Sequence, residues 1–437
     1  MTTRTIERRQ FLAGLAATPV AIAGCGHVQN GASPASAAAS PSDPWRRVRE
    51  EFTLSKEWLH FAGFLLASHP RVVREAIERH RRALDDNPAL YAEPRISDFA
   101  PVLKPAAAYM GVAPEQIALT DSTTMGLATI YHGLPLRQGD EVLTTLHDHY
   151  STHESLRLAT QRSGASLRKV ALYDDPAKAS VSGMASAIER ALAPATRCVA
   201  ITYVHSGTGV KTPVRAIADV IARANAARTA ETRILLCVDG VHGFGVENVT
   251  MGELGCDFFV AGTHKWLFGP RGTGVVWGRP ELWPMLRPTI PAFASSTFGA
   301  WIQGAAAPAT SAEAMSPGGF HSFEHRWALG EAFEFHRELG KDKVAARIHE
   351  LNRQCKQGLA AMKHVSLHTP MADELSSGII TFDVTGLKPE EVVKRLHEKR
   401  IVASTTPYAQ SYARLAPGLL NSPQEVEQVL GEIRALG

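Results

Sequence analysis

Polar residues that could perform imine and acid–base chemistry follow several apolar runs of this sequence. Lys265 comes shortly after the run "DFFVAG", and Asp239 ends the run "RILLCVD". Ser122, Thr123 and Thr124 follow "QIALT", where a helical pattern begins. A lysine forms an imine with an aldehyde once burial or neighbouring charge lowers its pKa enough to free the amine. Hydroxyls and free backbone N–H groups at a helix N-terminus bind anions, although the same hydroxyls also serve as ordinary helix caps.

A lysine and a carboxylate at separate strand ends, with an anion site nearby, match the chemical needs of pyridoxal 5'-phosphate (PLP). This cofactor carries an aldehyde, a phosphate and a pyridine nitrogen. An aspartate beside that nitrogen keeps it protonated, so the ring can accept the electrons of a carbanion. The sequence therefore predicts that Lys265 forms the imine and that Asp239 pairs with the ring nitrogen.

These residues need a sheet that brings them to one edge. Between about residues 103 and 280, helical patterns separate most of seven strand-like runs: "QIALT", "DEVLTTL", "SLRKVAL", "RCVAITYV", "RILLCVD", "CDFFVAG" and "TGVVWG". Runs that are apolar on both faces indicate a mostly parallel sheet covered on two sides, with ligands at the carboxyl ends of its strands. After about residue 310, long helices lead to the strand-like runs "SSGIITFDV" and "RIVAS". The predicted fold is α/β, with a large domain built on a mostly parallel seven-stranded sheet and a smaller α+β domain.

The N-terminus reads as an export signal. Arg8 and Arg9 precede an apolar run that ends in "IAGC" at Cys25, which resembles a twin-arginine signal with a lipobox. The twin-arginine machinery would export the folded protein to the periplasm or the outer side of the cytoplasmic membrane. A lipid anchor on Cys25 and cleavage further on, leaving a soluble protein, are the two alternatives.

Five segments follow from this organisation. They are a signal at 1–25, a flexible linker at 26–44, an N-terminal segment at 45–100 that contributes to the small domain, a large PLP-binding domain at 101–300 and a C-terminal small domain at 301–437.

Charge and cysteine content exclude other classes. The formal net charge is +3 and the basic residues form no long block, which argues against nucleic acid as a partner. Apart from Cys25, the cysteines stand far apart without a zinc-binding spacing, so we expect small buried thiols.

The motifs "TDSTTMG", "HSGTGVKTPV", "VDGVHGFG", "GTHKWLFGPRGTGVVW" and "RLAPGLLNSPQEV" together resemble class V aminotransferases of the fold-type I PLP enzymes. The resemblance covers roughly residues 55–435 and is strongest to the isopenicillin N epimerase-like branch, with cysteine desulfurases as more distant relatives. It implies a homodimer that acts on the amino group of an amino acid or peptide-like substrate through aldimine and quinonoid intermediates.

The resemblance also assigns residues to the cofactor. Lys265 would hold the aldimine and move protons, and Asp239 would pair with the pyridine nitrogen. His242 and Ser206 would approach the ring hydroxyl, although desulfurases carry an asparagine where Ser206 stands. The residues that would hold the phosphate are Ser122, Thr123, Thr124 and His264.

Other residues would serve the substrate or the partner subunit. His149 would stack on the cofactor face away from the lysine, with Tyr150 as the competing choice for that role. Arg414 would bind the substrate α-carboxylate through a two-pronged contact. The segment around His321 and Ser322 replaces the usual glycine–threonine element that reaches the partner's phosphate, and either residue could inherit that role.

Several alternatives stay open at this stage. The loop "ASTTPYAQSYA" before Arg414 lacks the nucleophilic cysteine of desulfurases, so desulfurase activity is not expected. Proton return, transamination and epimerisation are all compatible with the predicted site. Export suggests a substrate such as a secreted peptide or siderophore precursor under maturation. The rival classes are a metal-dependent enzyme that uses "HDHYSTH" and a non-catalytic PLP-binding protein of the same fold.

Overall fold

The structure, a computed structural model, describes residues 43–437. The predicted export signal, its Cys25 and nearly all of the linker therefore lie outside the described residues. Residues Pro44–Gly437 pack together as one unit. None of the helices in this part of the chain combines the length and the apolar character needed to cross a membrane.

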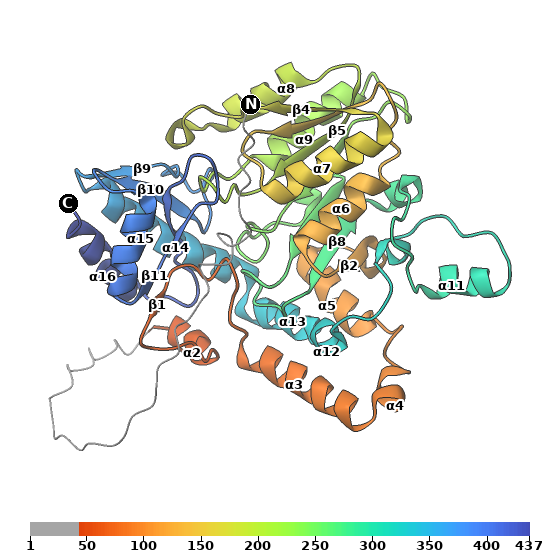
Figure 1. The fold of residues 1–437 in the computed structure, drawn as a ribbon, viewed down its shortest axis with the longest axis horizontal. Coiled ribbons are helices and arrows are strands. Elements are labelled where there is room, and N and C mark those ends of the chain that lie inside the picture. The colour runs from red at the N-terminus through yellow and green to blue at the C-terminus, as the bar shows by residue number, and fades with distance from the viewer. Residues whose placement is uncertain (1–42) are drawn as a thin grey trace, which may run out of the picture. The chain divides into compact units, whose positions relative to one another are not determined.

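A large sheet runs through this unit in the strand order β2-β8-β7-β6-β5-β3-β4 (Figure 1). The strands are β2 (Ile117–Thr120), β3 (Glu141–Thr145), β4 (Ser166–Val170), β5 (Thr196–Thr202), β6 (Leu235–Asp239), β7 (Phe258–Gly262) and β8 (Gly274–Gly278). Strands β7, β6, β5, β3 and β4 pair in parallel, whereas β8 is antiparallel to both of its neighbours. The predicted mostly parallel seven-stranded sheet is confirmed.

Helices cover both faces of the large sheet because its strands are apolar on both sides. In β5, Val199 and Ile201 join one core cluster, and Cys198 and Ala200 join the other. The first cluster includes residues of α5 (Ala100–Met110), α8 (Val181–Ala191) and α9 (Val214–Asn225). The second includes residues of α6 (Thr123–Gly133) and α7 (Tyr150–Ser163). All four described cysteines are free and buried, as expected from the sequence.

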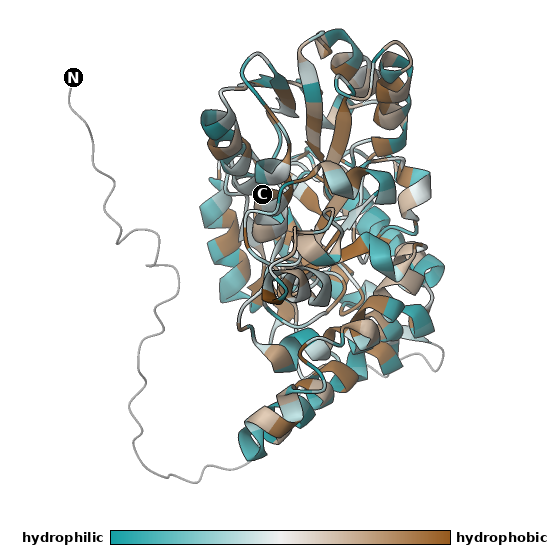
Figure 2. Ribbon diagram, turned by 90° about the vertical axis from the view of Figure 1, so that its right-hand side faces the viewer, coloured by the Kyte–Doolittle hydropathy of each residue, from teal (hydrophilic) through white to brown (hydrophobic). Residues whose placement is uncertain are grey.

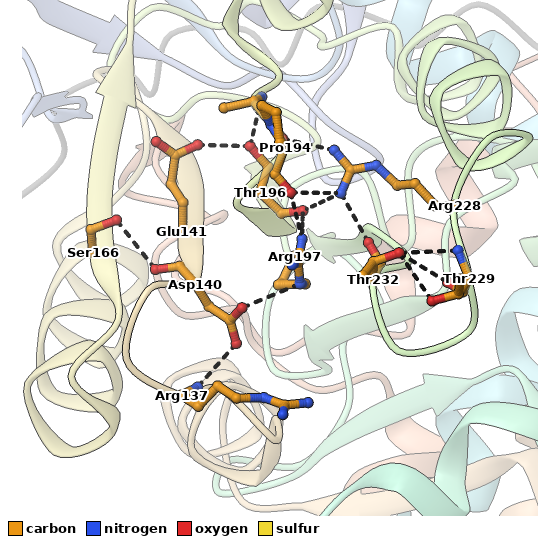
Figure 3. A network of polar contacts seen from close by, with 11 residues as sticks. Arg137, Asp140, Glu141, Ser166, Pro194, Thr196, Arg197, Arg228, Thr229 and Thr232 are labelled. Atoms are coloured by element: carbon orange, nitrogen blue, oxygen red, sulfur yellow. Dashed lines mark hydrogen bonds and ion pairs between the residues drawn. The ribbon is translucent and has the colours of Figure 1, made fainter.

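The amino ends of the central strands are joined by a dense polar network (Figure 3). At the start of β3, the Glu141 carboxylate accepts a hydrogen bond of 2.7 Å from the Thr196 hydroxyl. Arg197 pairs with Asp140 at 3.2 Å. The Arg228 guanidinium donates to backbone carbonyl oxygens, which belong to Ala193, Pro194, Thr196 and Thr232. Polar groups at this edge therefore bind mainly one another.

A smaller sheet of order β12-β13-β10-β9 lies beside the large one. Its strands are β9 (Val365–Leu367), β10 (Ile380–Val384), β12 (Ser404–Thr405) and β13 (Ala413–Leu415). Helices α14 (Lys341–Ala360), α15 (Pro389–Glu398) and α16 (Pro423–Arg434) share a core with this sheet. The short strand β1 (Leu59–His60) pairs in parallel with β11 (Ile401–Val402), so the N-terminal segment reaches the smaller sheet's side of the molecule.

The remaining helices surround these two sheets. They are α2 (Trp45–Glu50), α3 (Arg71–Asp86), α4 (Pro88–Ala92), α10 (Met251–Leu254), α11 (Ser295–Ile302), α12 (Phe323–Trp327) and α13 (Leu329–Leu339). Helix α3 carries hydrophilic and hydrophobic residues along its length (Figure 2), and it buries Val73 and Ala76. It packs mainly against α12 and α13.

Candidate active site

The carboxyl ends of the strands surround a cavity of about 300 Å³. It opens beside β2, β3, β5, β6 and β7 and meets β13 of the smaller sheet. Parallel topology explains this convergence, because it brings strand ends that are distant in sequence to one edge. Ten residues that the sequence predicts to contact the cofactor or substrate line this cavity: Ser122, Thr123, Thr124, His149, Ser206, Asp239, His242, His264, Lys265 and Arg414. The alternative candidates Tyr150, His321 and Ser322 do not line it.

Lys265 stands in a tight loop between β7 and β8. The Gly269 amide donates to the Thr263 carbonyl oxygen at 2.8 Å, and the Phe268 amide donates to the carbonyl oxygen of Lys265 at 3.1 Å. Phe268 has a φ of 58°, a left-handed conformation that is unfavourable for a bulky side chain. Such strain persists where surrounding packing holds it, often beside a functional group.

The amine of Lys265 is poised for reaction. Its Nζ lies 3.2 Å from Nε2 of His242. Burial lowers the pKa of Lys265 to about 8, while the nearby Asp239 carboxylate acts in the opposite direction. Burial also holds the pKa of His242 well below its ordinary value, so this imidazole is neutral. A neutral neighbour and a low pKa together leave a useful share of Lys265 as free amine near neutral pH.

Asp239 ends β6 in a fully enclosed position. Its Oδ1 accepts a hydrogen bond of 3.2 Å from the Val241 amide. Burial raises the pKa of Asp239 to about 6, and the charge of Lys265 partly offsets this effect. Asp239 is therefore mainly ionised at pH 7, although burial makes its charged form less stable than it would be in water. A buried carboxylate of this kind is well suited to a ligand that brings a positive N–H group.

The predicted phosphate cradle combines helix capping with one unsatisfied atom. Oγ of Ser122 caps α6 by accepting from the Met125 amide, and Oγ1 of Thr123 accepts from the Gly262 amide at 2.8 Å. Nδ1 of His264 is buried without a hydrogen-bond partner in the described part of the chain. Burial lowers the pKa of His264 to about 4, so its ring is neutral. An orphaned polar atom costs about 1–3 kcal/mol, which a ligand that satisfies it would recover.

Asp121 supports this cradle from outside the cavity. It precedes the cap residue Ser122 and accepts from Arg326 and pairs with His321, each at 3.0 Å. The other ring nitrogen of His321 lies 3.1 Å from the Pro317 carbonyl oxygen. Both His321 nitrogens thus contact groups of the same chain. The sequence analysis did not foresee the role of Asp121, because its two partners lie about 200 residues away.

His149 lies on the wall of the cavity as the cap of α7. Its Nδ1 lies 2.9 Å from the Ser151 hydroxyl, and burial lowers its pKa, with Lys265 adding to the effect. Tyr150 is 72% exposed and does not line the cavity. Of the two candidates for the stacking role, this arrangement favours His149.

Asp148 fixes the segment that carries His149. Its Oδ2 accepts from the Thr144 hydroxyl and the Thr145 amide, both at 2.8 Å, and its Oδ1 accepts from the Thr202 amide at 2.7 Å. This buried carboxylate therefore ties the ends of β3 and β5 together. The sequence analysis considered Asp148 only as part of a metal cluster and missed this positioning role.

The histidines of "HDHYSTH" do not gather around a common point. His147 accepts a hydrogen bond from the Leu172 amide at 3.1 Å, and His153 contacts the Thr145 carbonyl oxygen at 2.8 Å. His149 instead faces the cavity. Within residues 43–437, no three histidine, cysteine or acidic side chains are grouped closely enough to hold a metal ion. The metal-enzyme alternative has no support in this geometry.

Arg414 enters the cavity from β13. It donates to the Ser404 hydroxyl at 3.1 Å and to the carbonyl oxygens of Ser206 and Thr405 at 2.8 and 3.1 Å. A guanidinium has five N–H groups, and these contacts use three of them. With respect to the described residues, one N–H on each terminal nitrogen therefore remains for a ligand. The Phe64 ring covers the guanidinium at 4.4 Å. Burial lowers the pKa of Arg414 to about 10, so it remains charged at neutral pH.

Together these groups fit PLP. The cavity offers an amine for its aldehyde, a carboxylate for its pyridine nitrogen, and a helix N-terminus with an unsatisfied imidazole nitrogen for its phosphate. Arg414 is left over for the carboxylate of a second molecule. The roles of the individual residues nevertheless remain predictions, since the geometry shows only that they converge.

Comparison with known proteins places the chain in a family. The sequence profile of aminotransferase class V matches residues 102–411, and the chain belongs to this family. Isopenicillin N epimerase of Streptomyces clavuligerus is 26% identical over 341 residues, which cover 75% of this chain and 81% of that protein. A probable cysteine desulfurase of Halalkalibacterium halodurans is 26% identical over 64% of each chain. The predicted family and branch are therefore confirmed.

Solved structures share the fold. A mutant of the protein C-DES, with glycine covalently linked to its PLP cofactor, superposes with a TM-score of 0.81 at 22% identity, covering 89% of this chain and 99% of that one. The apo cysteine desulfurase of Thermococcus onnurineus gives a TM-score of 0.78 at 21% identity, covering 91% and 99%. The predicted α/β fold of fold-type I PLP enzymes is confirmed.

Proposed function

We propose that this protein is a PLP-dependent enzyme that acts on the amino group of an amino acid or peptide-like substrate, as an aminotransferase or epimerase. The observation that carries this proposal is the convergence of Lys265, Asp239 and Arg414 on one cavity with the Ser122–Thr124 cradle. When bound, PLP supplies an electron sink for a carbanion at the amino-bearing carbon. The similarity to an isopenicillin N epimerase supports the same class of reaction.

Each side chain would have a separate task. Lys265 would hold the cofactor covalently until a substrate amine displaces its Nζ, and the released amine could then take and return a proton. As a free amine in this cavity it has a pKa of about 8 because of burial. Asp239 would keep a proton on the pyridine nitrogen. His264 and the N-terminus of α6 would hold the phosphate. Arg414 would orient the substrate by binding the substrate's carboxylate.

Protonation on the opposite face would separate epimerisation from the other outcomes. His149 is the candidate group there, because its imidazole lines the cavity and could take up a proton and deliver it. Desulfurase chemistry would need a nucleophilic cysteine in the loop before Arg414. Loop 403–412 contains no cysteine, and the four cysteines of the described residues are buried elsewhere. This observation favours chemistry at the amino group over sulfur transfer.

We include a homodimer in the proposal. Helix α11 exposes large apolar side chains, with Phe298, Trp301 and Ile302 at 49%, 73% and 65% exposure. Contiguous exposed apolar residues indicate an interaction surface. Light scattering should give twice the chain mass, and a Trp301→Glu variant should shift the protein toward monomer, whereas a monomeric wild type would contradict the dimer.

The export hypothesis also belongs to this proposal and rests on residues 1–25 alone. PLP carries a charged phosphate that does not cross a membrane unaided, so an exported enzyme would need to leave the cytoplasm with its cofactor bound. Replacing Arg8 and Arg9 with lysine should retain the PLP-loaded protein in the cytoplasm. Its continued accumulation outside the inner membrane would contradict twin-arginine export, and labelled palmitate would test for a lipid on Cys25.

Covalent trapping tests the cofactor assignment directly. We expect the purified protein to absorb near the violet edge of the visible range, and borohydride reduction should leave the cofactor mass on the peptide that contains Lys265. Lys265→Ala should lose both signals and nearly all turnover while remaining folded. Lys169→Ala, a change at an exposed lysine on β4, is the matched control and should behave as wild type. Cofactor trapped at another lysine would overturn the assignment, and a folded wild type that binds PLP without turnover would support the non-catalytic alternative.

A further inference from the structure

The part of the cavity left after the cofactor residues is largely apolar. Phe64, Leu65, Val241 and Pro407 line it together with the hydroxyl residues Ser151 and Thr202 and the guanidinium of Arg414. Asp239 is the single carboxylate among the described lining residues, and the proposed function assigns it to the cofactor ring. A substrate held by Arg414 would therefore meet no free acidic group in this chain's cavity wall.

The loop that carries Leu65 is held firmly at the mouth of the cavity. The Phe61 amide donates to the Val402 carbonyl oxygen at 2.9 Å, and the Ala67 amide donates to the His264 carbonyl oxygen at 3.0 Å. Between these anchors, the buried Phe64 covers Arg414, and Leu65 remains 50% exposed. Leu65 thus presents an apolar surface next to the carboxylate-binding arginine.

Pro407 also lines the cavity, and the next residue, Tyr408, contacts the lining residues Ser206 and His149. Its hydroxyl lies 2.7 Å from Oγ of Ser206, and its ring packs on Gly207 so closely that a Cβ there would come within 2.9 Å of a ring carbon. The ring also meets His149 edge to face, with centroids 6.3 Å apart. These contacts fix Tyr408 and with it the position of the neighbouring Pro407 in the cavity wall.

We propose that the substrate is a free α-amino acid with an uncharged, apolar side chain, selected by Leu65 and Pro407 beside the carboxylate site of Arg414. This inference rests on the proposed function. A charged side chain in this position would lose part of its hydration without an opposite charge in the wall to compensate. An apolar side chain would instead gain free energy from burial against these apolar residues.

Binding of unreactive carboxylic acids tests the selection without turnover. We expect calorimetry on the PLP-loaded protein to show that affinity rises from acetate through butanoate to hexanoate, by up to about fourfold for each methylene that becomes buried. Adding a charge at the far end, in 6-(trimethylammonio)hexanoate or hexanedioate, neither of which has an amine that could react with the cofactor, should weaken binding at least about tenfold relative to hexanoate. Arg414→Met should weaken binding of every acid. Equal affinity for hexanoate and either charged acid, or failure of every acid to bind, would overturn the inference.

Two neighbouring leucines provide a matched pair of variants. Leu65 lines the cavity, whereas Leu66, at 54% exposure, does not. Leu65→Glu should reverse the preference toward 6-(trimethylammonio)hexanoate, and Leu66→Glu should leave the wild-type preference in place. Tyr408→Phe should keep the preference and Tyr408→Ala should reduce it, because packing of the ring on Gly207 and His149 positions the neighbouring Pro407. Equal effects at Leu65 and Leu66 would contradict the proposal.

Different results would contradict the proposed function and the proposed substrate class. If borohydride does not trap the cofactor on Lys265, the proposed function is wrong. If trapping succeeds and the charged acids still bind as tightly as hexanoate, only the substrate class is wrong.

Discussion

The two edges of the large sheet are both rich in charged and polar groups, yet they differ in how those groups are satisfied. At the amino edge, Arg228 donates to several backbone carbonyl oxygens and Glu141 accepts from Thr196 (Figure 3). Glu141 also accepts from Arg168. At the carboxyl edge, Lys265 pairs with a neutral histidine and His264 keeps an unpartnered nitrogen. Polar density alone therefore does not identify a site. A single unsatisfied atom does not identify one either, because Nε of Arg233 at the amino edge is also buried without a partner among the described residues. The carboxyl edge differs because an amine, a carboxylate and an imidazole with an unpartnered nitrogen line one cavity there.

The same contrast appears between two buried aspartates. Asp257, at the start of β7, accepts from Arg233 and from the Leu236 amide, at 2.8 and 2.9 Å. Asp239, at the end of β6, accepts from the Val241 amide and no arginine pairs with it among the described residues. Burial raises the pKa of both carboxyl groups. Asp257 serves the fold, whereas Asp239 retains charge that a ligand can use.

Replacing each of these two aspartates with asparagine should give the largest functional difference between the two edges. Asp239→Asn keeps the side-chain shape but removes the charge that would hold a proton on the pyridine nitrogen. We expect cofactor to bind and kcat to fall by about two orders of magnitude, or about 3 kcal/mol of barrier. Asp257→Asn is the control and should lower stability while leaving turnover within about twofold. Equal losses of kcat in the two variants would break the comparison.

Arg414→Lys should give the next largest effect. Lysine keeps the positive charge but cannot reproduce the planar two-pronged contact with a carboxylate. We expect KM to rise about tenfold or more and kcat to change less, because binding is the main loss. Steady-state kinetics over a range of substrate concentrations would check this. A fall in kcat with unchanged KM would place Arg414 outside substrate binding.

The pH dependence of cofactor uptake should report the lowered pKa of Lys265. Burial depresses its pKa to about 8, so the reactive free amine appears as pH rises through about 8 rather than near its ordinary value. The rate of PLP uptake by the cofactor-free protein should therefore increase through that range, as followed by absorbance. In Asp239→Asn the loss of a negative charge that favours the ammonium form should move the midpoint lower. A midpoint that rises or stays unchanged would contradict this coupling.

Arg228→Ala should have the smallest effect on function. It removes hydrogen bonds to backbone carbonyl oxygens at the amino edge, which should lower the free energy of unfolding by about 2 kcal/mol. Turnover of the folded protein should stay within about twofold of wild type, because the carboxyl edge is untouched. Denaturant unfolding followed by kinetics below the transition would test both parts. A large loss of kcat at full folding would show that the two edges are coupled.

Much of this site could be predicted because its residues lie in continuous motifs. Lys265, Asp239 and Ser122 each follow an apolar run that became a strand, and parallel topology places such ends at one edge. The choice between His149 and Tyr150 could not be made in this way. Both follow the same strand, and the direction of each side chain depends on how Asp148 holds the segment.

Contacts between distant segments were beyond prediction for a related reason. Phe64 covers Arg414 across 350 residues of chain, and Tyr408 meets Ser206 across about 200. Neither pair has a local spacing or periodicity that would reveal it. Such contacts arise only when the loops of the two sheets are brought together.

The sequence by itself determined the strand pattern, the family and the set of residues that could bind PLP, because hydrophobic periodicity and short motifs are local properties of the chain. Tertiary structure alone decided which polar groups are satisfied by the protein and which remain available. Burial lowers the pKa of Lys265 and raises that of Asp239, and burial is a property of the assembled fold. The shape of the substrate-facing wall was decided in the same way, since Leu65, Pro407 and Arg414 meet only after the smaller sheet has packed against the larger one.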